Sequence, residues 1–424
     1  EGWCSEAARF QADDLLGQGA PAKVWYRYRF IGQPVMDTQL LFWLGNAAYG
    51  ATDVGEVLDT ATRIDPGDER SWFEAWCATA ARLERFGDAA AAAGHPLSAA
   101  SHFQRAGSYY RAGLMRYADR ADPRIGEVTR AGLALHDRAL SLRGVDSAEV
   151  AIPYAGSSLF GRVYYAPGVD RAPFLVVCQG LHAWPEDVPW VWEGALRRGY
   201  HVLTFHGPGQ GASLRLGGLV FRPDWENVVA PVLDFAQTLP RLQPDRAVLM
   251  GLSMGGYLAP RAAAHEPRLY ALVADPGVVD WGGRMLAHFE DIPGLLALHA
   301  QGPAAFDRAI DAASLAMPDA RWYFDDVTWK HGVASPHAFV DAIRDYVIDD
   351  PGAIRCKTLI LDGTAEDATP GESQRLHDAV GGPKWLVTFD PDTAAQTHCQ
   401  GGATLLAEAR LFDWLDEEVR PTAG

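Results

Sequence analysis

Six short apolar runs, separated by stretches with helical spacing, constrain the fold of this chain most. They lie between residues 173 and 390 and read PFLVVCQG, YHVLTFHG, RAVLMGLS, LYALVAD, KTLILDG and KWLVTFD. Continuous apolar runs of this length are typical of buried strands, and strands that alternate with helices form a mostly parallel sheet with helices on both faces. Just upstream, AEVAIPYAGSSLFGRVYYAP predicts two further strands joined by a Gly/Ser turn. The sequence therefore predicts an α/β fold.

Two segments of the chain have helical rather than strand spacing. Residues 1–145 carry apolar stripes at helical intervals (Trp72, Trp76, Ala80, Leu83, Phe86; then Phe103, Ala106, Tyr110, Leu114) and predict an N-terminal helical domain. Residues 146–424 then form the α/β domain. Within it, about 281–350 contain no clear strand but many aromatic residues, which is too long for an unstructured loop. We expect a helical insertion over the carboxyl ends of the strands, which with the N-terminal helices would roof a ligand pocket.

The third apolar run ends in Gly251-Leu252-Ser253-Met254-Gly255, which fits G-x-S-x-G. A serine on a sharp turn between a strand and a helix exposes its hydroxyl in strained backbone geometry. The two glycines are expected because larger side chains would collide with the neighbouring strand and helix. Ser253 is therefore the predicted nucleophile.

A serine hydroxyl needs a base, and in this arrangement an acid and a histidine follow the serine along the chain. His398, after the last apolar run and before a helix, is the predicted base. The loop of LDGTAEDATP supplies the acid, for which Asp367 is preferred over Asp362 and Glu366. Asp362 is better explained as a turn former beside Gly363.

The segment VVCQGLHAWPED is where such a sheet supplies a second oxyanion donor. The backbone N–H groups of Leu181 and Met254 are the predicted oxyanion hole. His182 would then border the pocket, either as a substrate contact or as a structural residue. The glycine-rich FHGPGQGAS lacks the lysine of a phosphate loop and the helix start of a dinucleotide site, so no cofactor is expected.

Charge and cysteine content narrow the class of protein. The 37 Lys and Arg against 54 Asp and Glu give a net charge of −17, and no basic cluster suggests nucleic acid. The five cysteines form no CxxC pair, so neither a disulfide framework nor a metal site is expected. No apolar run is long enough to cross a membrane, and EGWCSEAARFQADD does not resemble a signal peptide. A cytoplasmic protein with a small-molecule substrate is the resulting expectation.

Several stretches together resemble a family within the α/β-hydrolase superfamily whose members carry an N-terminal helical domain. They include dihydroxypseudooxynicotine hydrolase and fungal hydrolases that shorten polyketides in pigment pathways. The matching stretches are GDERSWFEAW, AGHPLSAASHFQRAGSYYRAG, FHGPGQGAS, GLSMGGYLAPRAAAHEPRL, LDGTAEDATP and THC. The resemblance implies an α/β-hydrolase fold, the triad Ser253, Asp367 and His398, substrates with a ketone or acyl group, and often a homodimer.

The chain departs from that family near the expected pocket. His206 stands where the family commonly has Asp, so it is a candidate substrate contact. Members that cleave C–C bonds use an extra pocket carboxylate, for which Asp275 and Asp280 are candidates here, with helix capping as the alternative. The sequence therefore predicts a serine hydrolase acting on an ester, a thioester or a C–C bond next to a ketone of an apolar, polyketide-like molecule. A cyclase or acyl transferase on the same scaffold is the alternative, and a non-catalytic binding protein is a third hypothesis.

Overall fold

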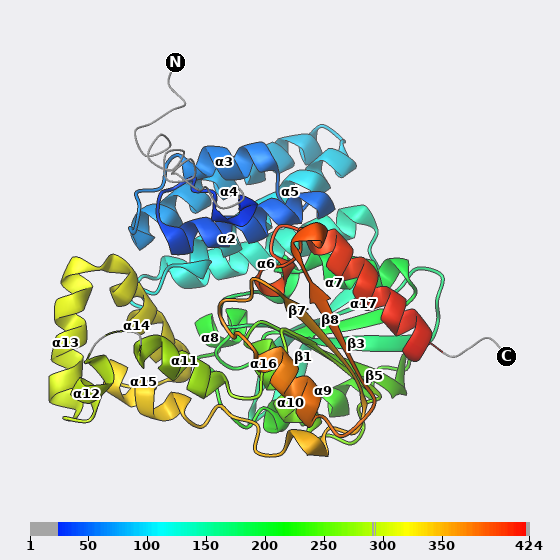
Figure 1. The fold of residues 1–424 in the computed structure, drawn as a ribbon. Helices are drawn as coiled ribbons and strands as arrows, with labels where there is room; N and C mark the ends of the chain where they lie inside the picture. The colour runs from blue at the N-terminus through cyan, green and yellow to red at the C-terminus, as the bar shows by residue number, and fades with distance from the viewer. Residues whose placement is uncertain (1–23, 291, 293, 421–424) are drawn as a thin grey trace.

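The computed structural model describes residues 24–290, 292 and 294–420. Cys4 and the segment examined for a signal peptide lie outside the described residues. In Figure 1 a helical layer at the top, a central sheet and a helical group at the left make up the molecule. Among the described residues, every helix is too short or too polar to cross a membrane.

One eight-stranded sheet forms the centre, and it confirms the predicted α/β-hydrolase fold. The strand order is β1-β2-β4-β3-β5-β6-β7-β8. The hairpin β1–β2 and the pair β2–β4 are antiparallel, and all other neighbours are parallel. The strands are β1 Ser147–Tyr154, β2 Ser157–Tyr164, β3 Ala172–Cys178, β4 His201–Phe205, β5 Leu242–Leu252, β6 Ala271–Asp275, β7 Lys357–Gly363 and β8 Lys384–Phe389.

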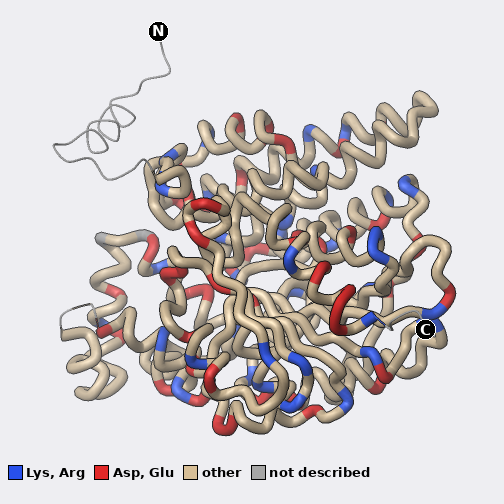
Figure 2. The backbone as a smooth tube through the Cα atoms, turned by 45° about the vertical axis from the view of Figure 1, so that its right-hand side comes forward, with Lys and Arg blue, Asp and Glu red and all other residues tan. Residues whose placement is uncertain are grey.

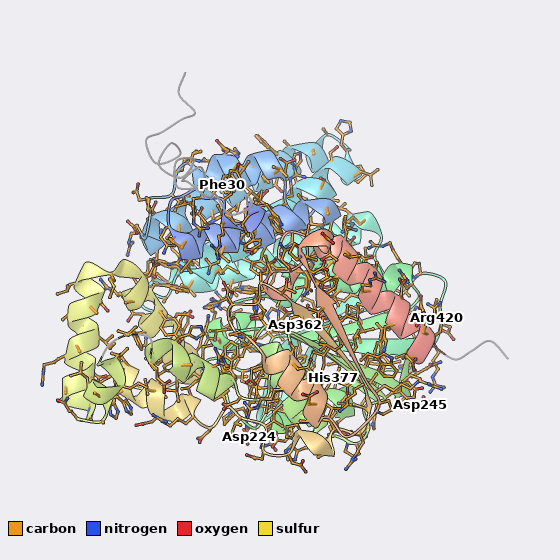
Figure 3. The ribbon with its side chains drawn as sticks, in the orientation of Figure 1. Phe30, Asp224, Asp245, Asp362, His377 and Arg420 are labelled. Atoms are coloured by element: carbon orange, nitrogen blue, oxygen red, sulfur yellow. The ribbon has the colours of Figure 1, made fainter. Side chains whose placement is uncertain are left out.

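Helices cover both faces of this sheet, as its buried strands require. On one face α7 (Pro189–Arg197) and α17 (Thr404–Glu418) pack against apolar side chains of β3, β5 and β7. On the other, α9 (Glu226–Ala236), α10 (Gly255–Ala263) and α16 (Glu372–Ala379) bury the alternate side chains of the same strands. Asp362 and His377, labelled in Figure 3, mark the end of β7 and helix α16. The short helix α8 (Gly211–Arg215) follows β4.

Residues 34–143 form five α-helices that lie above the sheet in the view of Figure 1. They are α2 Pro34–Gly45, α3 Val54–Ala61, α4 Glu69–Ala92, α5 Pro96–Met115 and α6 Arg124–Arg143. The stripes Trp72–Leu83 and Phe103–Ala106 are buried in their common core, because α4 and α5 pack face to face. Phe86, assigned to the same stripe from the sequence, is instead exposed, and its ring lies edge-on to His102.

The insertion between β6 and β7 also consists of helices. They are α11 Trp281–Glu290, α12 Leu295–His299, α13 Pro303–Ala316, α14 Pro318–His331 and α15 Pro336–Ile343. Short 3-10 helices are found elsewhere in the described chain: η1 Trp25–Arg27, η2 Asn46–Tyr49, η3 Pro185–Asp187, η4 Pro351–Ala353, η5 Pro391–Thr393 and η6 His398–Gln400.

Acidic and basic residues are interspersed along the described chain (Figure 2), in keeping with its diffuse negative charge.

Candidate active site

Ser253 lies on the turn between β5 and α10, in the geometry that the sequence predicts. Its φ of 58° is in the left-handed region, which costs a non-glycine residue free energy. The turn is held by a 2.7 Å hydrogen bond from the Ser253 N–H to the Asp275 carbonyl oxygen. A Cβ on Gly251 would lie 1.9 Å from the Gly255 carbonyl oxygen, and one on Gly255 would lie 2.6 Å from that of Cys178. Both glycines are therefore required by close backbone contacts.

His398 brings a base to this hydroxyl. Its Nε2 lies 2.8 Å from Ser253 Oγ, which is hydrogen-bond distance. The residue lies in η6, between β8 and α17, where the sequence places it. Ser253 and His398 are thus brought together from segments 145 residues apart.

The carboxylate beside His398 belongs to Glu366, and the prediction that Asp367 makes this contact is wrong. Glu366 Oε2 lies 2.7 Å and Oε1 3.0 Å from His398 Nδ1. The Glu366 Oε1 also accepts hydrogen bonds from the N–H groups of Ala368 and Thr369, so the loop folds around this side chain. Asp367 is exposed. Asp362 forms the expected turn contact, accepting from the Gly363 N–H at 2.9 Å.

The environment of Glu366 and His398 stabilises opposite charges on the two groups. Burial alone would raise the pKa of Glu366, but the nearby imidazole lowers it below its usual range. Burial alone would lower the pKa of His398, but the Cys399 thiol and the Glu366 carboxylate raise it above its usual range. The Glu366 carboxylate therefore stabilises positive charge on the imidazole, the charge that develops when a base accepts the serine proton.

Two backbone N–H groups next to Ser253 donate to no protein acceptor within the described part of the chain. They are those of Leu181, in the loop after β3, and Met254, at the start of α10. The loop after β3 is held by Gln210, whose Nε2 donates to the carbonyl oxygens of Gln179 (2.6 Å) and Gly180 (3.1 Å). Gln210 could not be predicted from the sequence, because a glutamine in a glycine-rich loop belongs to no motif.

A cavity of about 220 Å³ opens beside Ser253 and His398. Helix α2 and the end of α5 form one wall, with Gln39, Phe42, Trp43, Asn46 and Met115. The loop after β3 and the turn before α7 form the opposite wall. The expectation that the insertion also lines this space is not met, because the described lining contains no residue of 281–350. Of the two helical segments expected at the pocket, the described lining includes residues of the N-terminal helices only.

Several buried polar atoms of this lining lack a protein partner in the described structure. They are Gln39 Oε1, both amide atoms of Gln179, and Asp187 Oδ2. Asp187 Oδ1 accepts from Arg111 Nε at 2.7 Å, and burial raises the pKa of this carboxyl to about 7. Unpaired buried polar groups are costly, so a ligand that hydrogen-bonds to them would be favoured. Gln39, Gln179 and Asp187 could not be predicted from the sequence, because their positions depend on packing between distant segments.

The two pocket histidines proposed from the sequence have structural partners. His182 lines the cavity, and its Nε2 lies 3.0 Å from Asp326 Oδ2 of the insertion. His206 is buried with its Nε2 3.1 Å from Glu186 Oε1, and its Nδ1 accepts from the Ala212 N–H. The structure therefore places His182 at the cavity and His206 behind it.

Neither candidate for an extra carboxylate lines the cavity. Asp275 is completely buried under Ser253, and its Oδ1 accepts from Gln400 Nε2 at 3.0 Å. Burial raises the pKa of Asp275 to about 7. Asp280 precedes α11, and its Oδ1 accepts from the Gly283 N–H at 2.7 Å, which is the helix-capping role that the sequence left open.

Other hollows and side-chain groups lie away from Ser253. A wider, polar depression of about 490 Å³ is lined by charged residues of α4, α14 and the turn after α5. In the insertion, ligand atoms of His299, His337 and Asp341 lie within 4.8 Å of one another. The two imidazoles are stacked 4.0 Å apart and inclined by only 13°, so one ion cannot lie in both ring planes. This arrangement suits an ion pair with Asp341 better than a metal.

Comparison with known proteins agrees with the fold and with the motif. Residues 175–399, more than half of the chain, match the Alpha/beta hydrolase family. Hydrolase LUC6 of Fusarium sp and 20-hydroxy-prefusarin hydrolase FUS2 of Gibberella moniliformis are each 33% identical over 89% of this chain and 95% of their own length. The crystal structure of 2,6-dihydroxy-pseudo-oxynicotine hydrolase matches with a TM-score of 0.68 and 20% identity, covering 88% of this chain and 95% of that one. These matches confirm the resemblance read from the sequence: the chain belongs to the alpha/beta hydrolase family.

Proposed function

We propose that this protein is a serine hydrolase in which Ser253 is the nucleophile, His398 the base and Glu366 the residue that orients the base. The observation that carries this is the 2.8 Å contact between Ser253 Oγ and His398 Nε2 on a strained strand-to-helix turn. A hydroxyl in hydrogen-bond contact with an imidazole, itself bonded to a carboxylate, is the arrangement that activates serine.

The chemistry follows from these contacts. His398 Nε2 takes the Ser253 proton as Oγ attacks the substrate carbonyl carbon, and the carbonyl oxygen becomes an oxyanion. The N–H groups of Leu181 and Met254, which donate to no protein acceptor among the described residues, would stabilise that charge. The carbonyl re-forms as the leaving group departs with the proton from His398, which leaves Ser253 acylated. Water, deprotonated by His398, then releases the acyl group as a carboxylic acid.

The pocket supports a partly oxygenated, otherwise apolar substrate. Phe42, Trp43 and Met115 provide apolar contact area, whereas Gln39, Gln179 and Asp187 offer unpaired hydrogen-bonding atoms. The name of the FUS2 relative gives a hydroxylated molecule, 20-hydroxy-prefusarin, as what that protein hydrolyses. A polyketide-like molecule with hydroxyl or keto groups fits this lining. The bond that is cleaved is an ester, a thioester or a C–C bond next to a ketone.

A fluorophosphonate reagent tests the nucleophile. We expect wild-type protein to be labelled at Ser253, and Ser253→Ala to lose both labelling and hydrolysis of 4-nitrophenyl hexanoate. Ser108→Ala, which changes a buried serine of α5, is a matched control that should keep both. Labelling that persists in Ser253→Ala would contradict the assignment.

The bond type and the fate of the acyl group need separate measurements. Benzoylacetone and 4-nitrophenyl hexanoate, offered in parallel, compare cleavage of a C–C bond next to a ketone with cleavage of an ester. In ¹⁸O-labelled water, hydrolysis of either must place one labelled oxygen in the released carboxylate. A Ser253-dependent product without label would instead favour the cyclase or acyl-transferase alternative.

A further inference from the structure

The loop that carries the Leu181 N–H is held by side chains from two different parts of the chain. On one side Gln210 donates to the carbonyl oxygens of Gln179 and Gly180. On the other side His182, next to Leu181, contacts Asp326 of α14 in the insertion. The insertion therefore reaches this loop although its residues are absent from the described lining of the cavity.

The contact with the insertion is part of a buried group of side chains. His182 Nε2 lies 3.0 Å from Asp326 Oδ2, and the Lys330 ammonium lies 2.7 Å from the same oxygen. Asp326 and Lys330 are one helical turn apart on α14, and both side chains are almost completely buried. The ring of Trp322, on the same helix, stacks on the imidazole at a centroid distance of 5.4 Å. His182 is thus held by both its edge and its face.

The N-terminal helices support α14 from behind. The Arg116 guanidinium lies 4.0 Å from the centre of the Trp322 ring and 2.5 Å from Asp319 Oδ1. A chain of contacts therefore runs from the helical domain through α14 to His182. The side chains of Arg116, Asp326 and Lys330 are almost completely buried, whereas Asp319 is 37% exposed. A buried charge without its partner is costly, so these pairs favour one arrangement of the side chains.

The protonation of the group gives His182 one orientation. Burial and the neighbouring Lys330 lower the pKa of His182 to about 4, so the imidazole is neutral near pH 7. Burial would raise the pKa of Asp326, but Lys330 and His182 lower it below its usual range. A carboxylate only accepts hydrogen bonds, so the Nε2 of His182 carries the proton and donates it.

We infer that His182 and Asp326 are positioning residues that set the Leu181 N–H for the oxyanion. This inference rests on the proposed function of Ser253 and assigns the insertion a role in catalysis without substrate contact. Oxyanion stabilisation depends on donors lying about 2.7–3.1 Å from the developing charge, so a small displacement of the loop weakens it. Loss of the His182 contact should therefore affect the transition state more than substrate binding.

The test compares four variants with wild type. His182→Leu removes the donor; His182→Gln restores an N–H that can reach Asp326. Asp326→Asn keeps an acceptor but removes its charge. His288→Leu, at an exposed histidine of α11, is the matched control. For each, kcat and KM are measured with 4-nitrophenyl hexanoate, and inhibition constants with 1,1,1-trifluoro-2-heptanone, which forms an oxyanion on serine, and with N-methylhexanamide, which does not.

We expect His182→Leu to lower kcat by about 10- to 100-fold, since complete loss of one oxyanion donor costs about 10²- to 10³-fold. Its KM and its affinity for the amide should stay within about threefold of wild type, whereas the inhibition constant of the trifluoroketone should rise as kcat/KM falls. His182→Gln should recover most of the activity, Asp326→Asn should lie between the two, and His288→Leu should match wild type. A role in folding alone would not separate the two inhibitors.

The inference and the proposed function fail in different ways. If wild-type protein does not react with fluorophosphonate at Ser253, the proposed function is wrong. If wild type reacts but His182→Leu keeps its kcat and its trifluoroketone affinity, the positioning role is wrong. Should His182→Leu not fold, His182→Asn gives the same comparison, because its shorter side chain does not reach Asp326.

Discussion

Glu366 Oε2 lies 2.7 Å from His398 Nδ1, whereas the adjacent acidic residue, Asp367, is exposed to solvent. The same Glu366 side chain accepts hydrogen bonds from two backbone N–H groups of its own loop. It therefore shapes the loop and orients the imidazole with a single carboxylate. A shorter Asp at position 366 would have to give up one of these contacts to keep the other.

The first prediction concerns separate neutralisation of Glu366 and Asp367. Glu366→Gln removes the negative charge opposite His398, and kcat should fall by about 10³- to 10⁴-fold, as in the serine-protease case where the orienting carboxylate is neutralised. Asp367→Asn should change kcat by less than about threefold, because its side chain is exposed. Steady-state hydrolysis of 4-nitrophenyl hexanoate measures both. A larger loss in Asp367→Asn than in Glu366→Gln would mean that the loop rearranges in solution.

The sequence predicts much of the fold and two of the three residues of the proposed triad, Ser253 and His398. The apolar runs indicate the strands, because buried parallel strands have no polar face. The glycines around Ser253 indicate the turn, because backbone carbonyl groups lie too close to these positions for a side chain to fit. The choice between Glu366 and Asp367 could not be made in this way. Adjacent acidic residues in a loop differ only in where the backbone directs their side chains. Here that direction depends on tertiary contacts, such as the hydrogen bond from the Ala365 N–H to the Gln396 carbonyl oxygen and the contact of Glu366 with His398.

The origin of the pocket walls was also only partly predictable. An apolar stripe shows that a helix is covered, but not by which segment. Phe42 and Trp43 face the cavity because α2 lies across the end of the sheet, whereas the aromatic residues of the insertion pack mainly with one another. Helix packing at this distance along the chain depends on tertiary contacts that periodicity does not encode.

Substitution in α2 tests the contribution of the N-terminal helices to substrate binding. Phe42→Ala should raise KM for 4-nitrophenyl hexanoate several-fold more than KM for 4-nitrophenyl acetate, because only the longer acyl chain needs this apolar wall. Leu97→Ala, at an exposed leucine of α5, is the control and should change neither KM. Equal effects on both esters would indicate that α2 does not contact the acyl chain.

The Gly255 carbonyl oxygen lies so close to Gly251 that a larger residue at position 251 should destabilise the protein. Gly251→Ala places a Cβ within 1.9 Å of the Gly255 carbonyl oxygen, so the turn must shift. Overpacking of this kind costs about 1–3 kcal/mol or more, and kcat should fall because Ser253 moves with the turn. Gly126→Ala in α6, where a Cβ would lie 3.3 Å from the end of the flexible Arg130 side chain and 3.9 Å from Leu216 Cδ2, should be neutral or stabilising. Urea unfolding measures both variants, and equal free energies of unfolding would contradict the steric argument.

Asp275 predicts a pH dependence of stability that its removal should abolish. Burial raises the pKa of its carboxyl to about 7 in the folded protein, against an ordinary value of about 4 in the unfolded chain. Between these values the folded state keeps a proton that the unfolded state has lost. The contribution of Asp275 to stability is therefore fully present below about pH 4 and is lost as the pH rises to about 7, by at most about 1.4 kcal/mol per pH unit.

The variant Asp275→Asn tests this, because its side chain does not titrate and keeps an acceptor for Gln400. Its free energy of unfolding minus that of wild type should therefore increase from pH 5 to pH 7 and level off at higher pH, because wild type loses stability over this range. All other titrating groups cancel in this difference, and Asp245→Asn, at an exposed carboxylate of β5, provides the control. A difference between Asp275→Asn and wild type that stays constant across this range would contradict a raised pKa of Asp275 in the folded protein.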